Sequence, residues 1–434
     1  MDHHNFKGKD IPHIKLNSKT NIKELIEIYA NSGFNGRQLG EAAKLYSKMI
    51  HENATICLTV AGALTPVGFG GIIKTLLEKG FVDWIVTTGA NVYHEDHFAW
   101  GFPVKQGHFA VDDNILYDKE IVRIRDVYVK FYETLEMEDQ VIQKIFQKKI
   151  MDKPFTTAEF CNVLGSISKK KSKYPERSFI TTAYDLDVPV YISTLKDSSL
   201  ALNLAIHRLK GQPYNLDFVR EIIEQAAIVY NSKKSAVLEL GGGVPKNTAQ
   251  QTGPLLDQIL RKEHGGQDYI IQITDARPDT GGLSGATLQE GKSWGKVQDS
   301  HGGLITVYAD ATIAFPILAL YALSNEKPRK PKRLYKKLDK YYASLQDSAI
   351  EVPDKFKKLL KKSKKIPTEA QKGFHPKTAE QIMKVKEFYG GMSDYLKAIF
   401  CGTIAISARG CNNYLWTSTT VGKDVYPKKY IDFL

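Results

Sequence analysis

Six short apolar segments separated by helical patterns limit the fold of this sequence more than any other feature. We predict strands at residues 54–60, 82–87, 188–193, 236–240, 269–273 and 305–308. Residues 38–50 and 72–80 have helical patterns, and Asn21 with Glu24 has the spacing of a capping box before a first helix. Strands that alternate with helices predict an α/β fold built on a parallel sheet.

The carboxyl ends of the predicted strands carry glycine, threonine and aspartate, where sheets of this kind bind ligands. A strand ends at Thr88-Gly89, and another ends at three consecutive glycines, 241–243. Such a glycine run lets the backbone approach a phosphate or a ring, but a tight packing turn explains it equally well. The sequence contains neither GxGxxG nor GxxxxGK[ST], which excludes the standard dinucleotide fingerprint and the P-loop.

The net charge of +12 lies in one part of the chain. Residues 327–377 hold 17 Lys and Arg against five Asp and Glu, which leaves the rest of the chain neutral. We predict three parts: a catalytic α/β domain at 1–325, a lysine-rich helical insertion at 326–378 with helical stretches at 332–346 and 355–365, and a C-terminal segment at 379–434 that packs on the core. A solvated insertion is favoured over a nucleic-acid-binding one, because aromatic residues for base stacking are few. Nucleic acid is therefore not an expected partner.

The four cysteines, Cys57, Cys161, Cys401 and Cys411, show no CxxC pair or tight spacing. This usage favours a reducing compartment. The first residues lack the basic and apolar regions of a signal peptide, and no run of about 18 apolar residues occurs. We expect a cytoplasmic protein without a membrane partner.

Two polar stretches are candidates for chemistry. Residues 94–97 read His-Glu-Asp-His, which resembles a metal cluster in composition but lacks the HExxH spacing, so we predict a solvated loop and no metal. Lys296 follows Trp294 and a glycine, with Glu290 nearby. Desolvation beside the tryptophan would make the lysine amine available for imine chemistry, although most lysines are solvated surface charges.

Several separated blocks match one known family in the same order. They are Gly33-Phe34 with Leu39-Gly40, residues 82–89, residues 240–244 with Lys246, Ser284-Gly285, Glu290, residues 293–296 (Ser-Trp-Gly-Lys) and residues 308–311 (Tyr-Ala-Asp-Ala). In these blocks, which span about residues 21–323, the chain resembles the deoxyhypusine synthase family, including its homospermidine synthase-like branch. The Ser-Trp-Gly-Lys block is quite specific, whereas the basic segment and the tail are not covered.

The resemblance implies a Rossmann-like fold with helices on both faces of the sheet, NAD as cofactor, and a homotetramer with sites at subunit interfaces. It implies that NAD takes a hydride from a polyamine or diamine carbon, that Lys296 carries the aminobutylidene group as a Schiff base, and that an acceptor amine then takes this group. Besides the catalytic Lys296, it implies substrate contacts at Glu290, Trp294, His94, Glu95, Asn247, Gly281 and Gly282. NAD contacts are implied at Thr87, Thr88, Gly89, Glu95, Asp197, Gly242, Asp275, Ala276, Asp310 and Ala311.

The chain departs from the family where the family holds cationic amines. Leu202 and Leu283 stand in place of aspartates, Asn247 replaces a histidine, Gly62-Ala63 replaces Ser-Asn, and His94-Glu95-Asp96 follows a one-residue insertion. We therefore expect a small-amine acceptor, as in homospermidine formation. The alternatives are a deoxyhypusine synthase acting on a lysine of the hypusine-bearing translation factor, a non-catalytic binding protein that uses the basic segment, and an NAD-dependent amine dehydrogenase.

Overall fold

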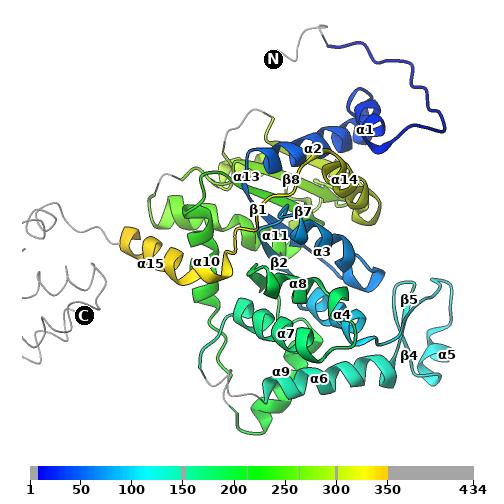
Figure 1. Cartoon of the computed structure of the whole chain (residues 1–434), viewed down its shortest axis with the longest axis vertical. Coiled ribbons are helices and arrows are strands. Elements are labelled where there is room, and N and C mark those ends of the chain that lie inside the picture. Colours follow the sequence, from blue (N-terminus) through cyan, green and yellow to red (C-terminus); the bar gives the residue numbers. More distant parts are fainter. Residues whose placement is uncertain (1–7, 148–152, 213, 263, 299–301, 350–434) are drawn as a thin grey trace, which may run out of the picture. The chain divides into compact units, whose positions relative to one another are not determined.

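The computed structural model describes residues 8–147, 153–212, 214–262, 264–298 and 302–349 (Figure 1). The chain divides into two compact units, Met1–Tyr341 and Tyr342–Leu434. Residues 342–349 are the described part of the second unit, so the predicted helix at 355–365 and the predicted C-terminal segment at 379–434 lie outside the described residues. The domain boundaries drawn from the sequence stay a prediction.

A six-stranded parallel sheet forms the centre of the first unit (Figure 1). The strand order is β6-β2-β1-β7-β8-β9. If the six strands of this sheet are numbered along the chain, the order is 3-2-1-4-5-6, which is that of the Rossmann fold. The predicted α/β class and all six predicted strands are confirmed. The strands are β1 (Thr55–Val60), β2 (Trp84–Thr87), β6 (Val190–Ile192), β7 (Ser235–Leu240), β8 (Tyr269–Thr274) and β9 (Leu304–Tyr308).

Helices connect these strands and cover the sheet. Asn21 accepts hydrogen bonds from the first turn of α1 and forms the predicted capping box with Glu24. The α-helices are α1 (Ile22–Ala30), α2 (Phe34–His51), α3 (Gly70–Glu78), α4 (Gly89–Trp100), α5 (Asp113–Asp118), α6 (Met137–Phe146), α7 (Thr157–Lys171), α8 (Phe179–Asp185), α9 (Ser199–Leu209), α10 (Phe218–Tyr230), α11 (Gly243–Gln250), α12 (Thr252–Pro254), α13 (Leu288–Ser293), α14 (Ala311–Asn325) and α15 (Leu338–Ala349). Short 3-10 or π turns are η1 (Thr65–Val67), η2 (Phe131–Glu136), η4 (Pro175–Arg177), η5 (Leu255–Ile259), η6 (Leu283–Gly285) and η7 (Tyr335–Lys337).

A second, antiparallel sheet lies between α4 and α6 and was not predicted. Its order is β3-β5-β4, and its strands are β3 (Val104–Gln106), β4 (Ile121–Ile124) and β5 (Val127–Lys130). Strands of three or four residues give too little alternation to detect in a sequence.

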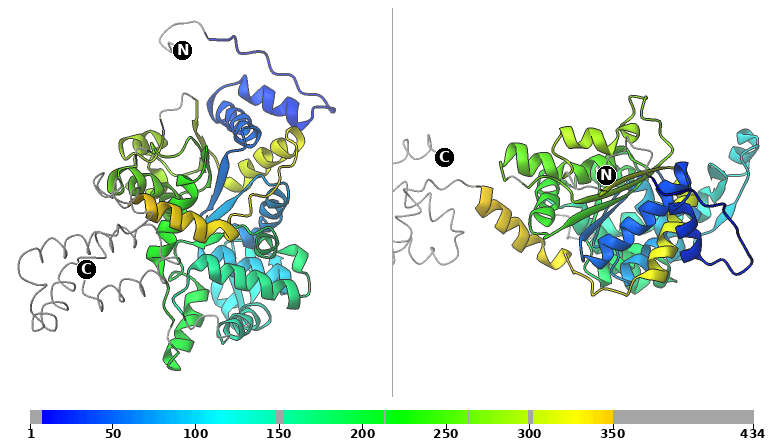
Figure 2. Two further views of the ribbon diagram at one scale, coloured as in Figure 1. Left: turned by 60° about the vertical axis from the view of Figure 1, so that its left-hand side comes forward. Right: turned by 90° about the horizontal axis from the view of Figure 1, so that it is seen from above.

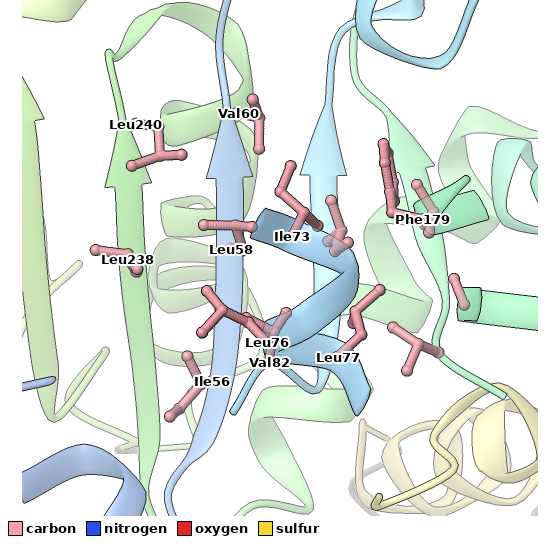
Figure 3. Packing of buried hydrophobic residues seen from close by; sticks show 14 of the residues in the cluster. Ile56, Leu58, Val60, Ile73, Leu76, Leu77, Val82, Phe179, Leu238 and Leu240 are labelled. Carbon is pink, nitrogen blue, oxygen red and sulfur yellow. The ribbon is translucent and has the colours of Figure 1, made fainter. Parts of the chain in front are cut away.

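The two faces of the parallel sheet differ in chemistry. On one face Leu58 and Leu238 pack with Ile73 and Leu77 of α3 in the main apolar core, as Figure 3 shows. Helix α14 contacts both α2 and α3 on this side, and Figure 2 shows α10 and α11 across the sheet from them. Because side chains alternate along a strand, the residue that follows each of these leucines in the sequence points to the other face. There Thr59, Glu239, Gln272 and Thr306 stand in register on four adjacent strands.

The start of the basic segment crosses the amino ends of three strands. We call residues 326–337 the strap. Arg329 and Lys332 lie 3.1 and 3.6 Å from the carboxylate of Asp83, which is buried just before β2. Arg333 and Lys336 pair with Asp187, just before β6.

The predicted solvated character is therefore wrong for Arg329 and Lys332, which are 10% and 18% exposed and balance a buried carboxylate. The helix predicted from residue 332 begins later, as η7 and then α15. Within the described part of the chain, no helix combines the length and apolar character needed to span a membrane.

Candidate active site

Glycine turns shape the carboxyl edge of the sheet between β1 and β7. Gly241 and Gly243 have φ values of +78° and +59°, which favour glycine. Gly242 packs so closely on η6 that an added Cβ would lie 2.5 Å from the Cα of Ser284. The turn after β7 is thereby fixed against the segment that leads to Lys296.

The turn after β2 is held by hydrogen bonds. Thr88 caps α4 by accepting from the amide of Asn91, and its hydroxyl donates to the carbonyl of Gly62 at 2.7 Å. Thr87 is buried and donates to the carbonyl of Val60. Gly89 approaches Ser198 so closely that a Cβ would meet its Oγ at 2.2 Å. The sequence therefore needs threonine and glycine here to join the loops after β1, β2 and β6.

The remaining residues predicted to contact NAD lie along the same edge. Asp197 follows β6, Asp275 and Ala276 follow β8, and Asp310 and Ala311 follow β9. The three aspartates are exposed. Asp310 also caps α14, since its carboxylate accepts from the amide of Thr312.

Lys296 lies beyond β8, on the loop that leaves α13. Its Nζ donates to the Oδ1 of Asn247 on α11 at 2.7 Å and lies 5.8 Å from the centroid of the Trp294 ring. Gly295 turns the chain with a φ of +65°. A Cβ on Gly253 of α12 would lie 2.5 Å from the carbonyl oxygen of Gly295, so α12 fixes the backbone behind the lysine. The predicted residues Asn247, Trp294 and Lys296 thus meet.

The surroundings of Lys296 favour its neutral amine. Partial burial and the nearby Lys246 ammonium lower the pKa of Lys296, and the carboxylates of Glu290 and Glu239 oppose this shift. A neutral amine is the form that attacks carbon and forms imines. The site can therefore supply an amine nucleophile next to an exposed aromatic ring.

The sequence interpretation missed a buried network behind Lys296. The Nζ of Lys246 donates to the Oε1 of Gln272 at 3.2 Å and to the carbonyl of Ala286 at 2.5 Å. The Nε2 of Gln250 donates to the Oε1 of Glu239 at 2.6 Å. A glutamate within an otherwise apolar strand was the available signal, but its partners come from other elements.

Comparison with known proteins shows the family of this chain. The sequence profile described as deoxyhypusine synthase matches residues 24–322, which is more than half of the chain. The chain belongs to the deoxyhypusine synthase family. This confirms the resemblance drawn from the sequence blocks.

Relatives within the deoxyhypusine synthase family cover most of the chain. It is 38% identical over 358 residues to the "Deoxyhypusine synthase-like protein" of Nostoc sp. (strain PCC 7120 / SAG 25.82 / UTEX 2576), covering 80% of this chain and 93% of the relative. It is also 38% identical to the protein of that name from Thermosynechococcus vestitus, over 82% of this chain and 90% of the relative. The "Probable deoxyhypusine synthase 1" of Archaeoglobus fulgidus is 37% identical over 70% of this chain and 94% of the relative.

The structure corrects the solvated loop predicted at residues 94–97. These residues lie inside α4, where Glu95, Asp96 and His97 are buried. His94 contacts His97, and the amide of Phe179 donates to Glu95 at 2.7 Å. A loop was predicted because burial by neighbouring helices is not visible in a polar tetrapeptide. Among the described residues, no group of three His, Cys, Asp or Glu side chains is placed to hold a metal ion.

Among the described residues, His94 contacts His97, Glu95 accepts from the amide of Phe179, and neither is hydrogen-bonded to Lys296. Burial lowers the pKa of His94 and of His97 to about 3, and raises the pKa of Glu95 to about 8. The carboxyl of Glu95 lines a cavity of about 390 Å³ between α3, α4 and η4. The predicted substrate residues therefore fall into two groups, one around Lys296 and one within α4.

Two of the positions where this family member departs from the pattern, Leu202 and Leu283, are on its surface. Leu202 on α9 is 69% exposed and Leu283 on η6 is 41% exposed. Gly281 and Gly282, just before Leu283, have open space where a Cβ would be. Leu202 and Leu283 present apolar groups at the positions where the sequence comparison with the family gave aspartates.

Proposed function

We propose that this deoxyhypusine synthase family member transfers an aminoalkyl group from a polyamine or diamine to a small-amine acceptor, through an imine on Lys296. The observation that carries the proposal is the position of Lys296. Its amine is held by Asn247, lies beside Trp294, and has a lowered pKa. Deoxyhypusine synthase proper, with a protein lysine as acceptor, is the alternative.

The residues around Lys296 would divide the work. Asn247 accepts one N–H of the amine and so orients its lone pair. The exposed ring face of Trp294 can hold a substrate ammonium by a cation–π contact, and Glu290 can pair with an ammonium. Attack by the neutral amine on a substrate imine carbon, with loss of the leaving amine, would leave the aminoalkylidene group on Lys296. The acceptor amine would then take the group and free the lysine.

We infer that NAD is the cofactor, because the carboxyl edge of the sheet fits it. Asp275 and Asp310 are exposed at the ends of adjacent strands, where carboxylates can accept from ribose hydroxyls. The Gly241–Gly243 turn and the amino end of α4 meet at the same edge. When bound, NAD would supply hydride transfer at a carbon next to nitrogen, accepting the hydride whose loss makes the substrate imine and returning it to the imine formed with the acceptor amine. Thr87 is buried and bonded to Val60, so its part is to hold the turn in place.

A small acceptor is proposed because two carboxylates of the family pattern are absent. A buried ammonium without a counter-charge costs several kcal/mol or more. With Leu202 and Leu283 at these positions, the site offers fewer anchors for a long polyamine with several charges.

A trapping experiment tests the proposal. Incubating the full chain with NAD and single amines, followed by borohydride, should fix an adduct on Lys296 that peptide mapping locates. Lys296→Ala should lose the adduct and lower turnover by about three orders of magnitude or more. Lys292→Ala, which removes an exposed lysine of α13 four residues before Lys296, is the matched control.

Three results would contradict parts of this assignment. An adduct elsewhere, or unchanged turnover in Lys296→Ala, would reject Lys296 as the nucleophile. Transfer only to the hypusine-bearing factor would favour the alternative acceptor. Release of a free aldehyde with no transferred product would indicate an amine dehydrogenase.

We also propose a homotetramer with sites at subunit interfaces, and a cytoplasmic location. The separation of His94 and Glu95 from Lys296 within one chain supports the first proposal, since a second subunit could bring the two groups together. The unpaired cysteines Cys57 and Cys161 support the second. Sedimentation of the purified protein would test the assembly.

A further inference from the structure

A row of polar side chains lies on the sheet face behind Lys296. Thr59, Glu239, Gln272 and Thr306 are cross-strand neighbours on β1, β7, β8 and β9. The opposite face of these strands belongs to the apolar core. Buried polar groups cost free energy unless they are paired, so such a row needs a physical explanation.

Lys246 connects this row to the loop that carries Lys296. It is 3% exposed, and its ammonium donates both to Gln272 of the row and to the carbonyl of Ala286. Ala286 lies between η6 and α13, just upstream of Lys296. The neighbour of Lys246 on α11, Asn247, accepts from the Lys296 amine. Two adjacent residues of α11 therefore contact the segment that carries Lys296, one at Ala286 and the other at the Lys296 amine.

Glu239 supplies the opposite charge. It is fully buried, its Oε1 accepts from Gln250, and its Oε2 has no hydrogen-bond partner among the residues that the structure describes. Burial raises the pKa of Glu239 to about 7, whereas Lys246, Gln250 and Lys296 act to lower it. The two lysines therefore favour the carboxylate form of Glu239, against the larger opposing effect of its burial.

We propose that Lys246 and Glu239 are positioning residues that set the protonation of Lys296 in opposite directions. The buried Lys246 ammonium disfavours a second positive charge on Lys296, and the Glu239 carboxylate opposes this effect by favouring the charged form of Lys296. The proposal deepens the proposed function and rests on it in one respect, namely that the neutral Lys296 amine is the nucleophile.

The direction of each effect follows from the charges around Lys296. Lys246 faces it from α11, Glu239 from β7 and Glu290 from α13, while Asp257 of η5 lies near the adjacent Gly295. Lys246→Met removes a like charge and should raise the pKa of Lys296. Glu239→Gln keeps the shape and a hydrogen bond to Gln250 but removes a negative charge. Because Lys246 keeps its two acceptors in that variant, it stays charged, and the pKa of Lys296 should fall.

Trace acetylation of the full chain measures this protonation without NAD or an amine substrate. Acetic anhydride reacts with the neutral amine, so labelling of the Lys296 peptide from about pH 6 to about pH 11 gives its titration curve by mass spectrometry. At a pH below the midpoint, Lys246→Met should label Lys296 about tenfold more slowly than wild type. Glu239→Gln should label it faster, and Lys246→Arg, which keeps the charge, should resemble wild type.

Lys44→Met, on α2 and paired with Glu27, is the matched control and should leave the Lys296 curve unchanged. Equal curves for wild type and a folded Lys246→Met would overturn the proposal, and so would a shift of Glu239→Gln in the same direction as Lys246→Met. If Lys246→Met does not fold, the sign of the Glu239→Gln shift decides alone. If the Lys246 and Glu239 variants shift the Lys296 labelling curve as expected but no substrate adduct can be trapped, the proposed function is rejected and the role of this charge pair is not.

Discussion

At the scale of the residue, Glu95 links the burial of a carboxyl group to pH. In the folded protein the pKa of Glu95 is about 8, above the value of 4.5 for an ordinary glutamate, mainly because burial desolvates the carboxyl group. A raised carboxyl pKa means that the unfolded state loses its proton first as pH rises. The contribution of Glu95 to stability is therefore fully present below about pH 4.5 and is lost as pH rises towards about 8.

Glu95→Gln should consequently stabilise the fold at pH 8 by an amount of order 1 kcal/mol and have a much smaller effect near pH 4.5. The amide oxygen can still accept from the amide of Phe179. Urea unfolding at both pH values measures the difference. Glu176→Gln, which changes an exposed carboxylate of the same cavity, is the control. Equal effects of Glu95→Gln at both pH values would show that its carboxyl is not held protonated.

Single residues were predictable where the sequence itself carries the contact. Lys296 and Trp294 are two positions apart, so their proximity follows from the chain. Glu239 and Gln250 meet only because β7 and α11 fold back on each other. The burial of Asp96 and His97 depends on packing from other helices and has no local signal.

At the scale of the element, α12 controls where the Lys296 loop lies. A Cβ on Gly253 would meet the carbonyl oxygen of Gly295 at 2.5 Å and the Cα of Lys296 at 3.0 Å. Gly253→Ala should therefore push this backbone away, cost about 1–3 kcal/mol of stability, and change the labelling of Lys296. Thermal unfolding and trace acetylation measure the two effects.

Gly71→Ala on α3 is the matched control, because nothing lies within 4 Å of its added Cβ and alanine favours a helix. A Gly253→Ala protein with wild-type stability and labelling would mean that the loop adapts freely and that α12 does not position the lysine.

The elements themselves were largely predictable, since alternating strands and helices leave a clear periodic pattern. The boundaries were less so: α2 begins at Phe34, before its predicted start, and the basic helix begins after its predicted start. The three-stranded antiparallel sheet was missed because each of its strands is very short. The parallel direction of the strands was implied by the helices that connect them. The register that aligns Thr59, Glu239, Gln272 and Thr306 could be seen only in the structure.

At the scale of the first unit as a whole, the strap joins distant parts of the sheet at its amino end. Arg329 donates to the carbonyls of Gly80 and Ala54 as well as to Asp83, whose side chain also accepts from the amide of Ile56. Side chains of Arg329 and Asp83 are 10% and 1% exposed. These bonds tie the chain after α14 to β1 and β2.

Asp83→Asn should cost about 3–5 kcal/mol, because it leaves two mostly buried cations without their counter-charge. Urea unfolding measures this loss. Asp279→Asn, in an exposed pair with Arg277, should cost no more than about 1 kcal/mol. Similar losses for the two variants would mean that the strap contributes little to stability.

The strap has a consequence for how such a protein can diverge. The same strands carry the proposed chemistry at one end and their ion-paired anchor at the other. Leu202 on α9 follows β6 and Leu283 on η6 follows β8, whereas the anchor at Asp83 and Asp187 precedes β2 and β6, so changes at these two leucines leave the anchor intact. Mutations at the chemical end can therefore change substrate preference while the ion pairs at Asp83 keep their contribution to the free energy of unfolding.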